Sequence, residues 1–432
     1  MKTLGPWLAL TGAAYLTAVL TLFLTRTPLG SPLFLGCAAV AAMAYAALMW
    51  RAAAAPRVPG RLLLAAIALA LAFRVPLALP RAGADSDMVR YVWDGRVQLL
   101  GYNPYLVVPA DPAMARTHTD ETRQMPSARA RTPYPPAAQL FFRLVVALRD
   151  STRAMKLALV ACDLLTIVVL WRWLVLTGRP AWLTLAYAWN PLVVLEIAHS
   201  GHVDALGALW IAASAYWLAR RRTGLATLAF VLAIATKLLP IVLLPLYWRR
   251  IRVRDAILGA VFMAFLYFPF VSGSVLPFGA VPNVVAHIRF NGPFFRWIAG
   301  LTTPQVAAMA AVGAGLLTAA WARWRLEPTD PAAWAWPMGV ALAAAPVIYP
   351  WYLLYLTPFL LAAATLPLSL WTLTVIPAYI VWDIARHGGR WVVPGWVMAV
   401  EYGLPLAVLG WRLAQGRSPS GSAPAAPPAE AV

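Results

Sequence analysis

Charge is scarce in this chain, and acid is scarcer still. Of 432 residues 12% are charged, and 16 Asp and Glu stand against 35 Lys and Arg. Only three of the basic residues are lysines: Lys2, Lys156 and Lys237. Cys37 and Cys162 both lie in apolar runs, which excludes a disulfide framework and a metal-binding cysteine spacing. The sequence also lacks a P-loop and a dinucleotide-binding glycine motif, so it shows no site for a nucleotide.

What the chain has in abundance is hydrophobic residues, which make up 62% of it. Apolar runs of about 18 or more residues recur, long enough to cross a hydrocarbon core of roughly 30 Å. These runs lack the polar face that a helix of a water-soluble protein would show. The sequence therefore predicts an all-α, polytopic transmembrane bundle of about 13 or 14 helices. Clear runs are Trp7–Leu24, Pro32–Trp50, Leu62–Leu79, Leu157–Leu176 and Ala256–Val271.

The formal charge of +19 would suit nucleic-acid binding, but the basic residues stand in short clusters between apolar runs. Such clusters follow the positive-inside bias, so we expect no nucleic-acid partner and a location in the inner (cytoplasmic) membrane. With an uncleaved first span, the segment from about 80 to 152 then faces outside. The helix count also places "RHGGR" (386–390) outside, against the bias. The clusters expected inside are 51–61, 219–224, 248–255 and 321–325.

Six regions follow from this pattern. They are three N-terminal spans (1–79), a large periplasmic loop with two amphipathic helices (80–152), central spans (153–272), an outer loop (273–302), C-terminal spans (303–415) and a tail expected to be disordered (416–432). In the central spans, one helix between clusters 219–224 and 248–255 would put them on opposite sides. Two short helices, 225–236 and 238–248, would keep both inside with Lys237 at the outer tip. One long tilted helix is the alternative.

Three aspartates follow the third span directly, although acid is rare elsewhere. A helical spacing places Asp87, Tyr91 and Asp94 on one face, with Arg90 beside it. The pattern predicts an amphipathic helix that lies on the membrane and carries a site. Asp85, just before it, can instead be a helix cap. A second amphipathic helix is expected within 132–150, where Tyr134 either lines a cavity or anchors the interface.

Ionisable residues at membrane depth mark functional sites by default. Glu196, His199, His202 and Asp204 surround an outer turn between two apolar helices. The His-x-x-His spacing resembles that of a metal site, but Ser200–Gly201 breaks the helix between the histidines. We therefore expect no metal, although a divalent ion would also fit this spacing. Hydrogen bonds to an anion or a sugar hydroxyl, or simple capping of the turn, would equally account for these residues.

Further polar and aromatic residues stand in the later outer segments. Lys237 is the one lysine inside "ATKLLPIVLLP", where it either snorkels to the interface or offers a fixed positive charge. Arg289 follows in the outer loop, within "HIRFNGPFFRW" (287–297). Tyr349 and Trp351 begin a proline-broken helix, where an aromatic belt is the ordinary explanation.

Carboxylates on one wall of a cavity and cations on another suit one class of reaction. An acceptor hydroxyl needs a base close by, and a departing phosphate needs cations to stabilise its charge. Because no nucleotide site is present, the donor is expected to come from the membrane as a polyprenyl-phosphate sugar. No cofactor is implied.

Several stretches resemble integral-membrane glycosyltransferases of the C-type (GT-C) superfamily, above all bacterial polyprenol-phosphate-mannose-dependent α-mannosyltransferases. The resemblance spans about 80 to 360 in the expected order. Asp87 and Tyr91 match the family's Asp-x-x-x-Tyr pattern, and Lys237 matches a lysine before proline. The stretches are "DMVRYVWDGRVQLLGYNPY", "YPPAAQLFF", "WNPLVVLEIAHSGHVDAL", "TKLLPIVLLPL" and "YPWYLLYLTP".

The resemblance implies that Asp87 is the catalytic base and that mannose passes, with inversion, to a lipid, glycan or protein acceptor outside the membrane. Lys237, with Arg90 or Arg289, would hold the donor phosphate, and His199, His202 and Asp204 match a His-containing turn of the family. One departure is the three spans before the catalytic loop, where many members have one. The competing functions are a lipid or glycolipid transporter (a flippase) and a structural scaffold.

Overall fold

The computed structural model of the chain describes residues 4–55, 58–81, 86–273, 277, 279–280 and 286–416. Asp85 and the tail from 417 onward lie outside this part, so the cap and the disorder expected there stay predictions. The described residues form helices and no strand, and Phe290 and Val347 form an isolated bridge. The predicted all-α, polytopic architecture is therefore confirmed.

Eight helices of the described part are long and apolar enough to cross a membrane, or nine if one bent pair forms a single span. The bent pair, Ala181–Ala188 with Pro191–His199, turns by 51°. The first three spans lie where the sequence places them. Six of the eight are the single helices α1 (Leu4–Thr25), α2 (Pro32–Ala53), α3 (Gly60–Ala78), α6 (Thr152–Leu176), α15 (Pro304–Arg325) and α19 (Gly395–Gly416). The seventh is α12 (Val253–Tyr267), which continues as a 3₁₀ turn to Phe270. The eighth, Ala363–Arg386, contains α17 (Leu366–Thr374) and α18 (Ile380–Arg386).

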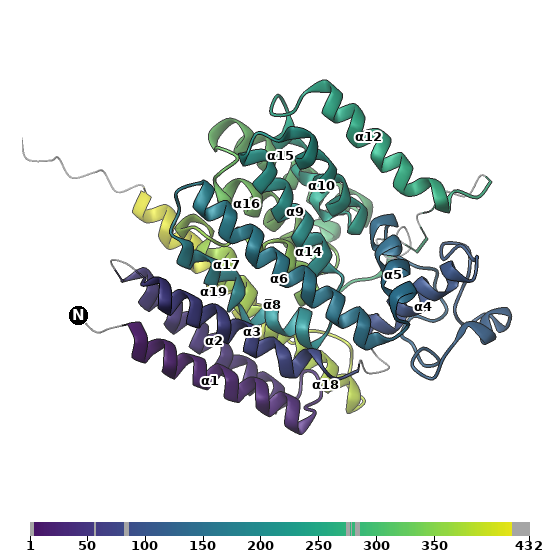
Figure 1. Cartoon of the computed structure of the whole chain (residues 1–432), viewed down its shortest axis with the longest axis horizontal. Helices are drawn as coiled ribbons and strands as arrows, with labels where there is room; N and C mark the ends of the chain where they lie inside the picture. Colours follow the sequence, from purple (N-terminus) through teal and green to yellow (C-terminus); the bar gives the residue numbers. More distant parts are fainter. Residues whose placement is uncertain are drawn as a thin grey trace, which may run out of the picture.

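The three N-terminal helices form their own layer, with α1 packed against both α2 and α3 (Figure 1). A buried ion pair joins this layer to the rest. Arg74 of α3 binds the carboxylate of Asp163 on α6, and its guanidinium also donates to the carbonyl oxygens of Ala70 (2.7 Å) and Ala188 (2.9 Å). The three N-terminal spans are thus fastened to the bundle by a hydrogen-bonded salt bridge.

The segment around Lys237 is a helical hairpin. Helix α10 (Thr223–Thr236) ends at Lys237, and the chain returns through a 3₁₀ turn (Leu239–Leu243) and α11 (Leu244–Tyr247). The Thr223 hydroxyl donates to Asp255 Oδ2 at 2.7 Å, so both ends of the hairpin lie at the same end of the bundle. One long helix, the alternative, is therefore absent; of the predicted pair, the first helix is present, and the second is a 3₁₀ turn followed by a four-residue α-helix. Pro240 explains the break, because it cannot continue an α-helical ladder.

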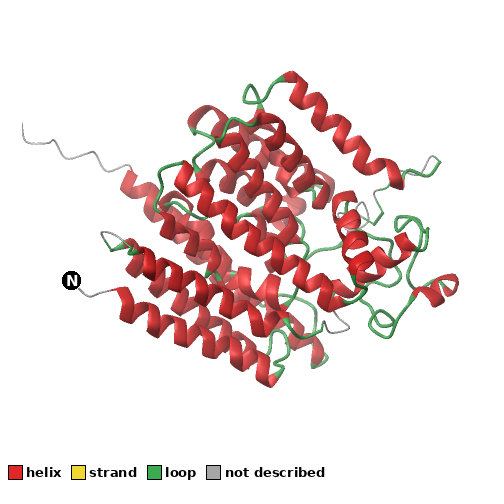
Figure 2. Ribbon diagram, in the orientation of Figure 1, coloured by secondary structure: helices red, strands yellow, loops and turns green. Residues whose placement is uncertain are grey.

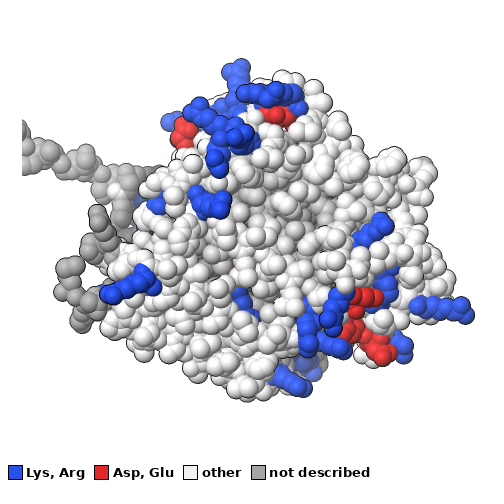
Figure 3. All heavy atoms as spheres, viewed as in Figure 1, with Lys and Arg blue, Asp and Glu red and all other residues white. Residues whose placement is uncertain are grey.

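Three of the four basic clusters meet at one end of the bundle. Thr223 of cluster 219–224 donates to Asp255 of cluster 248–255 at 2.7 Å, and Arg323 of cluster 321–325 donates to the carbonyl oxygen of Trp248 at 2.6 Å. Arg386 instead donates to the carbonyl oxygen of Leu29, in the turn between α1 and α2 at the other end. Figure 3 shows charged side chains toward two ends of the molecule, with a broad and almost uncharged belt between them.

The other end carries α4 (Asp87–Leu99) and α5 (Pro136–Leu148), surrounded by loops (Figure 2). We call it the α4 end. The sequence anticipates these two helices, but α4 is more completely covered than a surface helix, by α5, α6 and the loop around Pro112–Thr117. Gly95 allows the close approach of α4 and α5, because a Cβ there would lie 2.5 Å from the carbonyl oxygen of Phe142.

Candidate functional site

Asp87 occupies the first turn of α4. Ser86 caps this helix with its hydroxyl, which accepts from the backbone N–H of Met88. The turn before α9 (Asp204–Ala219) packs closely on that start, and Gly201 in it has a φ of +74°. A Cβ on Gly201 would lie 2.2 Å from the Met88 sulfur, so both its backbone conformation and the space require glycine. The two segments are therefore held together at the α4 end.

The turn before α9 brings a histidine between two carboxylates. His202 Nδ1 lies 3.9 Å from Asp87 Oδ2, and His202 Nε2 lies 3.3 Å from Glu196 Oε2. Glu196 belongs to a π-helical segment (Val194–His199) and is 0% exposed. Its other oxygen, Oε1, accepts from the Tyr379 hydroxyl at 2.6 Å. Single π-helical turns frequently occur at functional sites.

Lys237 enters the same region from the tip of the hairpin. Its Nζ lies 2.6 Å from Asp204 Oδ1, at the start of α9, and 3.7 Å from the centre of the Tyr352 ring. The side chain is 25% exposed. The carboxylate and the ring fix the direction of the ammonium group, because each attracts a cation. The extended backbone of Lys237 (φ −161°, ψ 143°) places it between the two helices.

A row of stacked rings extends from His202. The ring centres of His202 and Trp351 lie 4.0 Å apart, those of Trp351 and Tyr349 4.5 Å, and those of Tyr349 and Phe290 4.5 Å. The bridge to Val347 holds Phe290 in this row. We call these four rings the aromatic row. Because the rings cover one another's faces, the row forms an apolar wall of ring edges beside the polar groups.

Burial and neighbouring charge set the protonation states at this site. The Asp87 side chain is 36% exposed. Partial burial raises the pKa of its carboxyl above the usual range, while the charge of Lys237 and a hydrogen bond from Tyr134 oppose that shift. For His202, burial and then the charge of Lys237 lower the pKa well below the ordinary value, so the imidazole is neutral.

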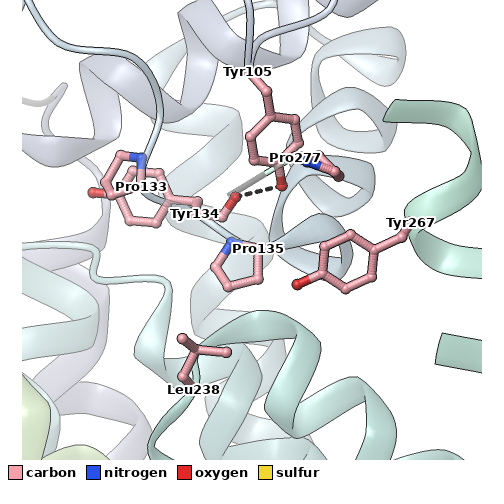
Figure 4. Close-up of a pocket in the computed structure, with 7 residues that line it drawn as sticks. All are labelled: Tyr105, Pro133, Tyr134, Pro135, Leu238, Tyr267 and Pro277. Atoms are coloured by element: carbon pink, nitrogen blue, oxygen red, sulfur yellow. Dashed lines mark hydrogen bonds between the residues drawn. The ribbon is translucent and has the colours of Figure 1, made fainter. Parts of the chain in front are cut away.

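Two tyrosines support Asp87. Tyr91 stacks on Phe142 at 4.5 Å, meets Tyr134 edge to face at 5.0 Å, and its hydroxyl accepts from the backbone N–H of Val203. Tyr134 also lines an apolar pocket beside the hairpin tip (Figure 4), and its carbonyl oxygen accepts from the Tyr105 hydroxyl. The expectation that Tyr134 lines a cavity thus agrees with the geometry. The pocket is lined by Tyr105, Pro133, Tyr134, Pro135, Leu238, Tyr267 and Pro277.

Not every residue singled out in the sequence faces this group. Arg90 and Asp94 are buried and pair with each other at 2.6 Å; Arg90 also donates to the carbonyl oxygen of Ala130. His199 lies against Phe34 of α2, with ring centres 5.8 Å apart. Arg289 donates to nearby backbone carbonyl oxygens, next to Phe290 at the far end of the aromatic row.

The two histidines of the His-x-x-His spacing therefore do not converge. Within the described ranges, no group of three or more His, Cys, Asp or Glu side chains is arranged to hold a metal ion.

Glu196, Tyr352 and Tyr379 also enter the site, and of these the sequence singles out only Glu196, as part of the outer turn. Glu196 is visible in the sequence as an acid within an apolar run, but its partners lie far along the chain. Tyr352 and Tyr379 give no signal, because buried tyrosines in a membrane protein are usually packing or interfacial residues.

No protein family, curated protein or solved structure matches this chain. Its function therefore has to be argued from the site. The arrangement offers one partly exposed carboxylate, a fixed ammonium group and an aromatic surface at one end of a membrane bundle. Together these groups can remove a proton from a hydroxyl and stabilise an anion beside it.

Proposed function

We propose that the chain is a membrane glycosyltransferase. It transfers a sugar from a polyprenyl-phosphate donor to a hydroxyl of a lipid, glycan or protein on the outer side of the inner membrane. The sugar that we propose is mannose. The observation that carries the proposal is the convergence of Asp87, His202 and Lys237 from three separate segments at the α4 end. The resemblance to GT-C mannosyltransferases supports the choice of donor and sugar.

In the reaction, Asp87 takes the proton of the acceptor hydroxyl while the oxygen attacks C1 of the sugar. The bond from C1 to the phosphate oxygen breaks, and its electron pair stays on the phosphate. Lys237 stabilises that anion, and Asp204 keeps the ammonium group in place. Attack opposite the leaving phosphate inverts the configuration at C1. A single base suffices, because the phosphate leaves without being protonated.

A lipid or glycolipid transporter is the second candidate, since transporters also carry broken helices and buried charges. No distance or contact in the site favours it over transfer. The two functions differ in one observable: a transferase makes product in detergent micelles, whereas transport needs a sealed compartment.

The test is Asp87→Asn in purified protein. The substrates are radiolabelled mannose on a polyprenyl phosphate, and a membrane lipid and glycan extract as acceptor. We expect transfer in micelles by the wild type and a fall of roughly 10²- to 10⁴-fold in the variant, because the amide cannot take the proton. Asp383→Asn, in a half-exposed pair with Arg386, is the control and should keep its activity. Wild-type rates in Asp87→Asn would refute the assignment.

The pH dependence gives a second readout. Asp87 acts only when ionised, so activity is lost as the pH falls through its pKa. An ordinary aspartate has a pKa of about 3.9. Because burial raises the pKa of Asp87, activity should be lost at a higher pH than that. The acid limb of kcat/KM against pH measures it, and a limb at the ordinary value would contradict the assignment.

A further inference from the structure

An apolar pocket of about 500 Å³ lies at the basic end of the bundle, opposite the α4 end. Helix α15 packs on α16 (Pro331–Ala343) and α17 packs on α19, and the pocket lies between these two helix pairs (Figure 1). Its volume is in the range of about 300–1,000 Å³ that is typical of ligand sites. Its lining includes Thr318 and Trp321 of α15, Trp336 of α16, and Leu409, Arg412 and Leu413 of α19.

The two helix pairs are in close contact deeper in the bundle. There Gly339 of α16 lies against Leu368 of α17, and a Cβ on the glycine would come within 2.9 Å of the leucine side chain. Toward the basic end, the Trp336 indole donates to the carbonyl oxygen of Ala364 at 3.2 Å. The pocket is therefore a gap between packed helices, with a floor toward the middle of the bundle.

The lining changes from apolar to charged toward the basic end. Along α19, Leu409 lies about one turn, or ~5 Å, deeper than Arg412. Arg412 in turn lies about one turn before the end of α19 at Gly416, and Trp321 about one turn before the end of α15 at Arg325. Tryptophan and arginine near the ends of transmembrane helices are typical of the boundary between lipid headgroups and acyl chains.

The charge of Arg412 is not balanced by the described part of the chain. Within that part, no carboxylate lines the pocket, and the buried Nε of Arg412 has no hydrogen-bond partner. The guanidinium carbon lies 5.6 Å from the centre of the Trp411 ring. Arg323, at the same end, instead donates from Nε to the carbonyl oxygen of Trp248. An anion beside Arg412 would supply a counter-charge that the described residues do not.

We propose that this pocket binds an anionic phospholipid, with the phosphate at Arg412 and one acyl chain in the apolar gap beyond it. Trp321 and Leu413 are 56% and 57% exposed, so the pocket opens to the membrane and a lipid can enter from the side. Basic pockets between transmembrane helices bind anionic headgroups in this way. A zwitterionic headgroup carries its own cation and gains less from Arg412. The inference does not rest on the proposed function, because it concerns the opposite end of the bundle.

The experiment measures lipid binding to the purified full chain in detergent micelles. Phosphatidylglycerol or phosphatidylcholine is titrated in, and native mass spectrometry gives the Kd of the first lipid that binds. We expect phosphatidylglycerol to bind roughly 10-fold more tightly, because only its headgroup has a net negative charge for the guanidinium. Equal Kd values for the two lipids would overturn the proposal.

Arg412→Gln removes the charge and keeps a polar side chain at a partly exposed position. We expect the Kd for phosphatidylglycerol to rise roughly 10-fold, to the value for phosphatidylcholine, which itself should not change. Arg325→Gln is the matched control, because Arg325 is exposed at the same end but does not line the pocket. It should change the Kd by less than about 3-fold, as the loss of one general surface charge. Equal losses in both variants would refute a site at Arg412.

Thr318→Phe tests the apolar part, because it fills the gap and leaves Arg412 in place. The Thr318 hydroxyl donates to the carbonyl oxygen of Ala314 in its own helix at 2.7 Å, so its loss leaves no polar group unpaired in the pocket. We expect both lipids to bind roughly 10-fold more weakly. Undiminished binding would show that no acyl chain occupies the pocket, and would overturn the proposal.

Thermal unfolding in the same micelles gives an independent readout. A ligand that binds the folded state raises Tm, so phosphatidylglycerol should raise the Tm of the wild type and of Arg325→Gln more than that of the two pocket variants. Without lipid, the Tm of each variant shows whether it is folded, and Arg412→Gln decides alone if Thr318→Phe is not. An equal rise in Tm for the wild type and Arg412→Gln would contradict the proposed site.

Discussion

Two groups of buried acids lie in this molecule, and they differ in how completely their hydrogen bonds are made. Arg74 and Asp163, between α3 and α6, are 2% and 0% exposed and form a two-pronged salt bridge. The remaining guanidinium nitrogen donates to two backbone carbonyl oxygens. At the α4 end, by contrast, Glu196 and His202 keep polar atoms without a partner in the described part of the chain.

The difference shows that burial of charge does not by itself mark a functional site. Buried pairs with complete hydrogen bonding are stable and leave nothing for a ligand. Incomplete bonding is costly, and a fold retains it where a ligand or a moving proton supplies the missing partner. Under the proposed function, Arg74 and Asp163 belong to the structural core, whereas Asp87 and His202 belong to the proposed site.

The largest effect is expected for Asp163→Ala, which tests whether the Arg74–Asp163 pair is purely structural. Removing the carboxylate leaves Arg74 charged and unpaired in the bundle, which should lower the free energy of unfolding by about 3–5 kcal/mol. Denaturant or thermal unfolding in detergent measures the loss. The folded fraction should still transfer sugar with an unchanged KM. A stable but inactive Asp163→Ala would place this pair in the reaction and end the contrast.

Two matched variants sharpen that result. The double variant Arg74→Met, Asp163→Leu replaces the pair by apolar side chains and should recover most of the stability. Asp383→Ala breaks the half-exposed pair with Arg386 and should cost less than about 1 kcal/mol.

A smaller effect is expected for Lys237→Met, in the proposed site at the α4 end. The ammonium group should contribute a charge-assisted bond to the donor phosphate as it binds and leaves, worth about 1.5–3 kcal/mol, so kcat/KM for the donor should fall roughly 10- to 100-fold. Lys156→Met is the matched control, because that lysine is also buried but donates to the carbonyl oxygen of Leu77. Equal changes in both variants would remove Lys237 from the site.

Much of the fold follows from the sequence, because length and hydropathy decide which segments can cross a bilayer. The first three spans, the hairpin around Lys237 and the common end of the basic clusters were all predictable from apolar runs and charge. The short 3₁₀ and π-helical segments were not. They depend on packing against neighbouring helices, as where Glu196 meets Tyr379 from a distant part of the chain.

The site was predictable where a residue stands out against its surroundings. Asp87 and Lys237 are rare charges in apolar sequence, and the structure brings both beside the turn of His202. Arg90 and Asp94 have the same appearance in sequence, yet they pair with each other. Helical spacing shows that they are neighbours, but only the structure shows that Arg90 turns to Asp94 and to the carbonyl oxygen of Ala130.

The smallest expected effect concerns two tryptophans, one in the proposed site and one near the Arg74–Asp163 pair. Trp351 stacks on His202 at 4.0 Å, whereas Trp189 packs edge to face on Phe73, one residue from Arg74. If the aromatic row holds the sugar, Trp351→Leu should raise KM about 2- to 10-fold, the effect of losing one ring contact, with little change in kcat.

Trp189→Leu is the matched variant near the Arg74–Asp163 pair. It should lower stability, because it leaves a cavity in a fully packed core, and it should leave KM unchanged. Transfer kinetics and unfolding on the same two proteins decide the matter. If both variants alter KM alike, the aromatic row has no special part in binding. If Trp189→Leu alone alters KM, the Arg74–Asp163 region and the proposed site are coupled, because a packing change beside Arg74 would then affect substrate binding.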